Sequence, residues 1–257
     1  EPRISLSAVE AVNASRRLLK RLRADHPQLP LIVVADSLYS TTPMIELLKD
    51  KRMSFLLVAK EGDHKSLYRD IEGLRRDGLL DSRRRVEKRG KAGERRYLYE
   101  WTGGVALGSS AGSPTVNYMQ LTISKADGSR SYRNSWVTDM EVSEENVEDL
   151  VRGARARWKI ENEGFNTLKN QGYHLEHNFG HGTKHLSEAF FVLNLLAYFV
   201  HQILSLVDQW YQSARAGFSS RVEFWGAIRA IFRMFFFDSW DDVLERMNAP
   251  PTALPPR

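Results

Sequence analysis

A strand–helix–strand pattern near the N-terminus constrains the fold more than any other feature of the sequence. Residues 29–36 (LPLIVVAD) and 54–60 (SFLLVAK) each contain a continuous apolar run rather than an alternating one. Such runs are typical of strands that are covered on both faces, as in parallel sheets. Between them, Thr42 and Pro43 predict a helix start, as N-cap and first helical residue. A right-handed parallel crossover follows, so the sequence predicts an α/β fold.

Other patterns surround this unit. A basic amphipathic helix is expected at 8–24, before the first strand. Residues 61–133 are rich in Arg, Gly and Ser and contain alternating segments, with Asp127-Gly128 as a hairpin signal. This texture predicts an inserted antiparallel β subdomain. A returning strand is expected at 135–140, followed by a helix that Ser143 caps.

A long apolar segment lies in the C-terminal half. Ala189 to Val207 carries no formal charge and is long enough to cross a membrane. It contains Asn194, His201 and Gln202, however, and lacks close basic flanks on both sides. We therefore expect a buried core helix at 186–207 and no membrane partner.

An amphipathic helix at about 221–237 and a proline-rich tail from Ala249 complete the C-terminal helical region. The sequence thus divides into four predicted regions: 1–60, 61–133, 134–207 and 208–257.

Composition narrows the chemistry. The chain has no cysteine, which excludes a disulfide framework, a thiolate zinc site and a cysteine nucleophile. The net charge of +5 is concentrated, because Arg83 to Arg96 holds eight basic and two acidic residues. That run is either a solvated β-ribbon face or a surface for nucleic acid. The N-terminus has no signal-peptide pattern.

Two acidic residues are candidates for chemistry. Asp36 follows a predicted buried strand at the sheet edge where α/β proteins bind ligands, and Lys60 ends the next strand. Asp36 could ligate a metal or only cap the following helix. Arg157 and Glu161 are four residues apart and would share a helix face, with the alternative of a surface ion pair. We expect four apolar side chains to anchor this helix in the core: Trp158, Ile160, Phe165 and Leu168.

These segments carry a family resemblance. R-W-x-I-E followed by F-x-x-L-K, together with A-D-S-L-Y-S after an apolar strand, resembles bacterial insertion-sequence transposases of the DDE type. The resemblance covers about residues 15–206 and implies an RNase H-like α/β fold. It also implies acidic residues that hold two Mg²⁺ or Mn²⁺ ions for cleavage and strand transfer at DNA phosphodiesters.

The resemblance assigns roles to residues of this chain. Asp36 and Glu161 match the second and third acids, which are catalytic and bind metal, and Arg157 and Lys169 match phosphate contacts. Lys60 and the basic run add expected DNA contacts, the run through Arg83, Arg84, Arg85, Lys88 and Arg89. The implied partners are double-stranded DNA, as terminal inverted repeats and target, and a second copy in a homodimer. The implied location is the bacterial cytoplasm, at the nucleoid.

The chain departs from the family pattern in several places. Ala154 stands where the family has a tyrosine, Lys169 falls one residue late, and Glu163 is a rival for the third acid. The strands that carry the first acid would precede the basic helix, and Glu10 and Asp25 are poor substitutes for that acid. We therefore expect an N-terminally incomplete transposase, with a catalytically inactive DNA-binding remnant as the alternative.

Two further groups of residues have weaker interpretations. His174, His177, His181 and His185 cluster with Glu176, which allows a zinc-dependent hydrolase as a third hypothesis. Gly180 and Gly182 interrupt any helix there, so packing beside the active site is favoured. Trp101 and Trp136 could support a flipped base, but core packing is the expected role.

Overall fold

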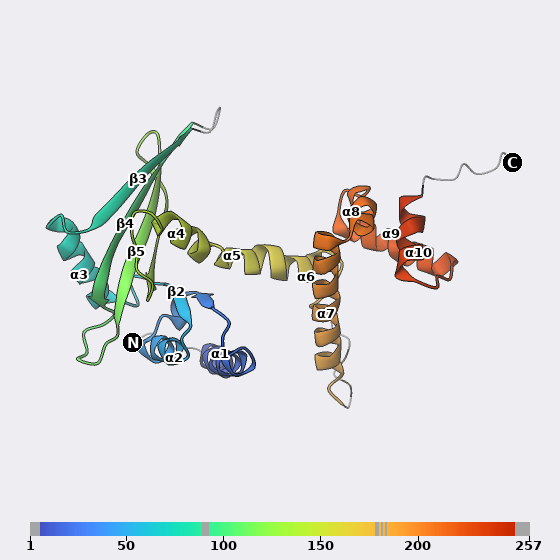
Figure 1. Ribbon diagram of the computed structural model, residues 1–257, viewed down its shortest axis with the longest axis horizontal. Coiled ribbons are helices and arrows are strands. Elements are labelled where there is room, and N and C mark those ends of the chain that lie inside the picture. Colours follow the sequence, from blue (N-terminus) through green and yellow to red (C-terminus); the bar gives the residue numbers. More distant parts are fainter. Residues whose placement is uncertain (1–5, 89–92, 178–179, 181, 183, 250–257) are drawn as a thin grey trace. The chain divides into compact units, whose positions relative to one another are not determined.

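The computed structural model describes residues 6–88, 93–177, 180, 182 and 184–249. The chain divides into two compact units, Glu1–Arg157 and Trp158–Arg257 (Figure 1). Each unit has a hydrophobic core of its own.

The first unit is built on one sheet. Within the described residues it has six strands in the order β1-β2-β6-β5-β4-β3. β1 (Ile32–Ala35) and β2 (Ser54–Val58) are parallel, with α2 (Thr42–Asp50) in the crossover between them. This confirms the α/β class. The antiparallel strands extend the same sheet: β3 (Asp81–Lys88), β4 (Glu94–Ala106), β5 (Thr115–Lys125) and β6 (Arg130–Thr138).

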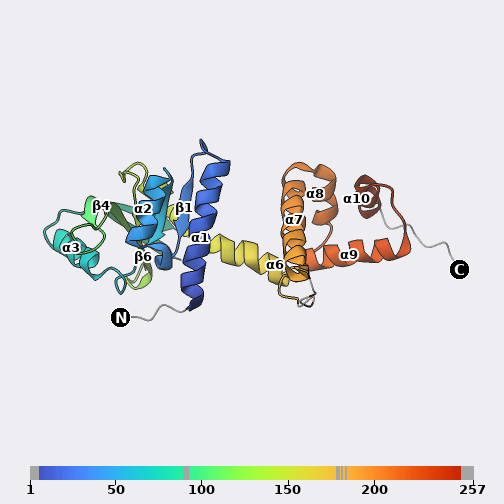
Figure 2. The same ribbon diagram turned by 90° about the horizontal axis from the view of Figure 1, so that it is seen from below.

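Helices cover both faces of this sheet, as the continuous apolar run of β2 requires. Phe55 and Leu57 contact one core, with α1 (Leu6–Asp25), α2 and α3 (Lys65–Arg76) on that face; α1 and α2 lie in front of the sheet in Figure 2. Leu56 and Val58 point to the opposite core, which α4 (Val147–Arg155) covers. Alternation along β2 therefore places apolar side chains in two layers, and β2 is buried on both sides.

Three local predictions in this unit are wrong. Residues 61–133 are not β structure alone, because α3 lies among them and buries Leu67 and Ile71, which are spaced one helical turn apart. α2 starts one residue early, with Thr41 as N-cap rather than Thr42. α4 starts at Val147, so Ser143 lies four residues before the helix and Asn146 is the N-cap, without a side-chain capping bond. The Asn146 side chain instead accepts a hydrogen bond from the Ser143 amide at 2.9 Å.

The second unit is helical. Short segments come first: α5 (Arg157–Lys159), whose first residue still belongs to the first unit, the π-helical segment η3 (Ile160–Phe165) and α6 (Asn166–Asn170). Four longer helices follow: α7 (Leu186–Val207), α8 (Gln209–Ala216), α9 (Arg221–Met234) and α10 (Trp240–Asn248). Tyr211, Phe224 and Leu244 bring α8, α9 and α10 together in one core. The sequence missed α8 and α10, although Ser239 and Asp242 form a capping box that marks the start of α10.

α7 has the predicted bounds but not the predicted burial. None of its residues is buried in the described structure, and Phe199 is 61% exposed. The core of this unit comes from α8 to α10, and of α7 only Leu204 is among the residues that pack against it. Apolar composition indicates that burial of a helix is favourable, but it does not show which other element buries it. By length and composition alone α7 could cross a membrane, which is weak evidence for a span.

Candidate functional site

Asp36 lies where β1 ends, at the carboxyl edge of the sheet. It is the N-cap of the 3₁₀ turn η1 (Ser37–Tyr39), and its Oδ1 accepts a hydrogen bond from the Leu38 amide at 3.0 Å. The carboxylate is half-buried. A carboxylate has two oxygens, so the cap fixes the orientation of the side chain while Oδ2 can still ligate a cation.

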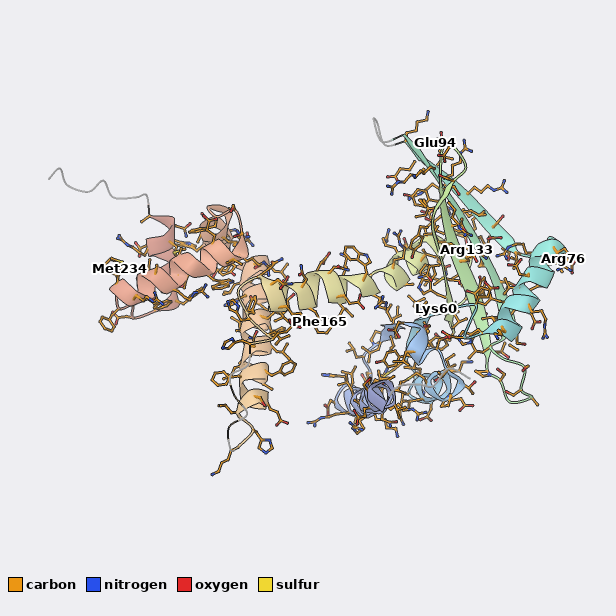
Figure 3. The ribbon with its side chains drawn as sticks, turned by 180° about the vertical axis from the view of Figure 1, so that it is seen from behind. Lys60, Arg76, Glu94, Arg133, Phe165 and Met234 are labelled. Carbon is orange, nitrogen blue, oxygen red and sulfur yellow. The ribbon has the colours of Figure 1, made fainter. Side chains whose placement is uncertain are left out.

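Lys60 lies at the same edge of the same unit. β1 and β2 pair in parallel with Ala35 opposite Leu57, so both strands end on one side of the sheet. Lys60 follows two residues after β2 and is exposed (Figure 3). The crossover thus brings Asp36 and Lys60 to one edge, as their positions in the sequence predict.

Glu161 belongs to the second unit and lies in η3. The Asn166 amide donates to the Glu161 carbonyl five residues earlier, which is the π-helical pattern. The prediction that Arg157 and Glu161 share a helix face assumed a regular α-helix, and that spacing does not hold through η3. π-helical turns occur frequently at functional sites. Glu163 lies 4.0 Å from Lys159 in an exposed ion pair.

The predicted anchoring of this helix is mostly wrong. Leu168 is buried, but Trp158, Ile160 and Phe165 are each about half exposed. Because these side chains are aromatic or branched, we expected them to pack in the core beside Glu161. Here exposed apolar side chains lie beside exposed charges instead.

The two predicted phosphate contacts have different surroundings. Arg157 is the last residue of the first unit and is partly buried. Lys169, in α6, makes an ion pair of 2.5 Å with Glu176, so a phosphate would have to compete with that carboxylate.

The basic run separates into two faces of β3. Arg83 and Arg85 both make ion pairs with Glu148 of α4, at 3.0 and 3.3 Å, and Arg85 also lies over the Tyr97 ring. Arg84 and Lys88 alternate with them and are exposed. Arg89 lies outside the described residues. Of the four described side chains on β3 that were expected to contact DNA, two hold α4 to the sheet and two face solvent.

The histidine cluster does not form a metal site in the part of the chain that is described. No group of three potential ligands is close enough there, and His185 pairs with Glu188 at 2.9 Å. His181 lies outside the described residues. Trp136 and Trp101 are 1% and 6% exposed, so they are core residues as expected and present no face to a base.

Sequence reasoning missed three residues that share a pocket with Lys60. Tyr68, Arg130 and Arg133 line a pocket together with Lys60, on the same unit. Burial raises the pKa of Tyr68, so this phenol stays protonated. The signal was present in part, since Arg130 and Arg133 closely follow the predicted hairpin turn at Asp127-Gly128.

A family model described as a transposase DDE domain matches residues 7–200, which include Asp36, Arg157, Glu161 and Lys169. No curated protein matches the chain.

Proposed function

The chain belongs to the transposase DDE domain family, and from that membership we propose that Asp36 and Glu161 are catalytic acids for DNA cleavage and strand transfer. The family acts on DNA as a polynucleotidyl transferase. The substrate we propose is the double-stranded end of an insertion sequence, in the bacterial cytoplasm, with two copies of the protein acting on paired ends.

The position of Asp36 is the observation that carries this proposal. It follows a buried strand directly, at the carboxyl edge of a parallel pair, and its side chain is held by the Leu38 amide. Ligands bind at this edge in open α/β sheets. A carboxylate fixed on a rigid strand end is suited to hold a reacting group in place.

The donor set suits Mg²⁺ or Mn²⁺. Carboxylate oxygens are the hard ligands that these ions prefer, and Asp36 and Glu161 would supply them. Bound ions would activate the attacking hydroxyl and stabilise the leaving oxygen.

The cationic side chains would position the DNA. Arg157 presents a planar guanidinium that can bind a phosphate with two parallel hydrogen bonds. Lys169 would exchange its Glu176 partner for phosphate, and Lys60 would contact the backbone beside Asp36.

Strand cleavage tests the proposal. Asp36→Asn and Glu161→Gln, made in the longest protein that the reading frame encodes, should each lower the cleavage rate about 1,000-fold or more, because each removes a metal ligand. The readout is nicking of a labelled duplex that carries the element end. Glu163→Gln is the matched control and should cleave within about threefold of wild type.

The outcomes separate the alternatives. If Glu163→Gln is inert and Glu161→Gln is active, Glu163 is the third acid. If neither Asp36→Asn nor Glu161→Gln slows cleavage, the assignment is wrong. A wild-type protein that binds DNA and never cleaves it would support the inactive remnant.

A further inference from the structure

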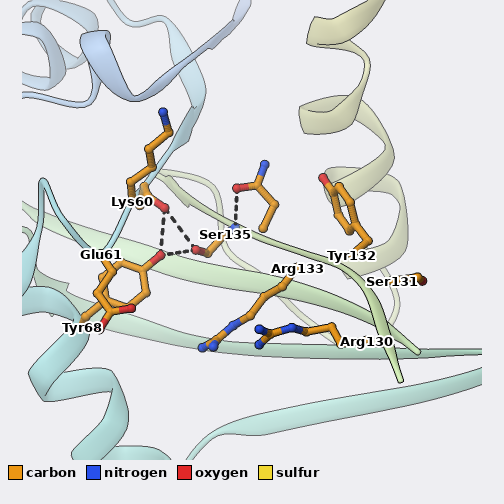
Figure 4. A pocket seen from close by; sticks show the side chains of 10 residues that line it. Lys60, Glu61, Tyr68, Arg130, Ser131, Tyr132, Arg133 and Ser135 are labelled. Atoms are coloured by element: carbon orange, nitrogen blue, oxygen red, sulfur yellow. Dashed lines mark hydrogen bonds between the residues drawn. The ribbon is translucent and has the colours of Figure 1, made fainter. Parts of the chain in front are cut away.

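A pocket of about 450 Å³ opens between β2, α3 and β6 (Figure 4). Its floor is polar and buried: the Tyr68 hydroxyl donates to the Ala59 carbonyl at 2.9 Å and also contacts the Ser135 hydroxyl. Three cationic side chains line it, Lys60, Arg130 and Arg133, against one carboxylate, Glu61. The lining is therefore net positive.

A β-bulge places the two arginines on one face. Arg130 and Arg133 are three residues apart, and in a regular strand they would point to opposite faces. In β6, however, Arg130 is opposite Ser124 and Arg133 is opposite Thr122. Those partners are two residues apart in β5 and share a face, so the bulge at Ser131 brings both arginines to the α3 side. Bulges commonly redirect a side chain beside a functional site.

Arg133 is held in place by groups that leave donors for a ligand. Its Nε donates to the Gln120 side chain at 3.1 Å, and its terminal nitrogen lies 3.7 Å from Glu72. A guanidinium has five N–H donors, and most of them are on the two terminal nitrogens. Arg130 is exposed and lies beside Arg133 with its guanidinium turned the same way (Figure 4). Two neighbouring guanidinium groups offer the paired N–H donors that phosphate oxygens accept.

We propose that this pocket is a subsite for the phosphodiester backbone of one DNA strand, held by Arg130, Arg133 and Lys60. This inference rests on the proposed function, because it takes DNA as the partner. Lys60 belongs both to the pocket and to the sheet edge of Asp36. The register places Asp36 two strand spacings from Trp136, and Arg133 lies three residues further along β6. At strand spacings of about 5 Å and a rise of about 3.3 Å per residue, Asp36 and Arg133 are on the order of 15 Å apart. A DNA strand that passes Asp36 would therefore reach the pocket within a few phosphates.

Duplex binding by the 257-residue chain tests the subsite without requiring cleavage. The probe is a fluorescein-labelled duplex of about 30 base pairs, titrated at several KCl concentrations without divalent ions. Arg130→Gln/Arg133→Gln should weaken binding about tenfold or more and lower the slope of log K against log salt by about 2, one for each lost phosphate contact. Two duplexes of different sequence should lose affinity equally, since phosphate contacts carry no sequence information.

Two variants control for folding and for charge. Arg130→Gln alone leaves the Gln120 contact of Arg133 intact and should lower the slope by about 1. Arg21→Gln/Arg152→Gln removes the same charge from exposed positions of the same unit and should leave the slope unchanged. Thermal unfolding confirms that each variant is folded.

Three results would overturn the subsite. The first is an unchanged slope of log K against log salt in both pocket variants. The second is a loss of duplex affinity in the Arg21/Arg152 control as large as that in the double pocket variant. The third is a loss of affinity for only one of the two duplex sequences. Failure of the proposed function looks different: Asp36→Asn would then cleave normally, while the pocket variants still lose duplex binding.

Discussion

At the scale of single residues, His201 is the clearest pH-sensitive group. Its ring is 4.1 Å from the Trp225 ring, centroid to centroid, and its Nδ1 is 2.7 Å from the Tyr173 hydroxyl. Burial, assisted by the nearby Arg221 charge, lowers the pKa of His201 to about 4. Burial raises the pKa of Tyr173, so the phenol stays protonated and donates to a neutral imidazole.

This environment predicts a loss of stability in mild acid. An unfolded histidine takes up a proton near pH 6.5, whereas the folded His201 does so only near pH 4. The stabilisation is complete above pH 6.5 and is lost progressively as the pH falls toward 4. The free energy of unfolding should decrease by about 1 kcal/mol per pH unit in that window, below the ideal 1.4 because the ring is only partly buried. Urea unfolding followed by tryptophan fluorescence measures it.

His201→Asn keeps a hydrogen-bond acceptor for Tyr173 and removes the titration, so its stability should change less with pH over the same window. His64 is also buried with a lowered pKa and acts in the same direction, so His64→Asn measures its share separately. A His201→Asn profile parallel to that of wild type would contradict the prediction.

At the scale of elements, the alternating sequence of β3 places cations with different roles on its two faces. The Glu148 side chain is only 20% exposed and receives both Arg83 and Arg85. Arg84 and Lys88 point the other way into solvent. Two cations therefore stabilise the packing of α4 on one face of β3, and two cations on the other face can contact DNA.

Two double variants of equal charge separate these roles. Arg83→Gln/Arg85→Gln should lower the free energy of unfolding by about 2 kcal/mol, because it leaves a largely buried carboxylate without its cations. Arg84→Gln/Lys88→Gln should change stability by less than about 0.5 kcal/mol and weaken duplex binding instead. The measurements are urea unfolding and fluorescence anisotropy. Equal effects of both variants on DNA affinity would mean that only net charge is sensed.

The elements also show how far sequence reasoning reaches. The parallel crossover at 29–60 was predictable because two apolar runs and a Thr-Pro helix start agree with one another. The position of Asp36 followed from that crossover. The bulge at Ser131 and the π-helical turn around Glu161 were not predictable, since each depends on backbone pairing that no periodicity encodes.

α3 and α7 were misread for a related reason. α3 lies among strands of alternating texture, and its Leu67 and Ile71 signal is short. α7 is apolar but is not buried in the core of α8 to α10, so apolar composition alone does not show where a helix packs. The remaining site roles, those of Glu161, Arg157 and Lys169 above all, stay predictions until cleavage is measured.

At the scale of the whole molecule, local contacts rather than net charge should control DNA binding. The net charge is only +5, yet described cations gather on the outer face of β3 and around the pocket. Counterion release depends on the number of phosphates that are neutralised, not on the total charge. Five side chains of the first unit are placed to make such contacts: Lys60, Arg84, Lys88, Arg130 and Arg133.

These five phosphate contacts alone predict a slope of about −4.5 for log K against log salt, and the proposed contacts of Arg157 and Lys169 would make it steeper. Duplex affinity of the wild-type chain should then fall at least about 500-fold between 50 and 200 mM KCl, as measured by anisotropy without divalent ions. Glu10→Gln/Glu245→Gln raises the net charge by two at exposed positions and adds no contact, so it should leave the slope unchanged. A steeper slope in that variant would make net charge the determinant, and a nearly flat wild-type plot would exclude binding through the phosphate backbone.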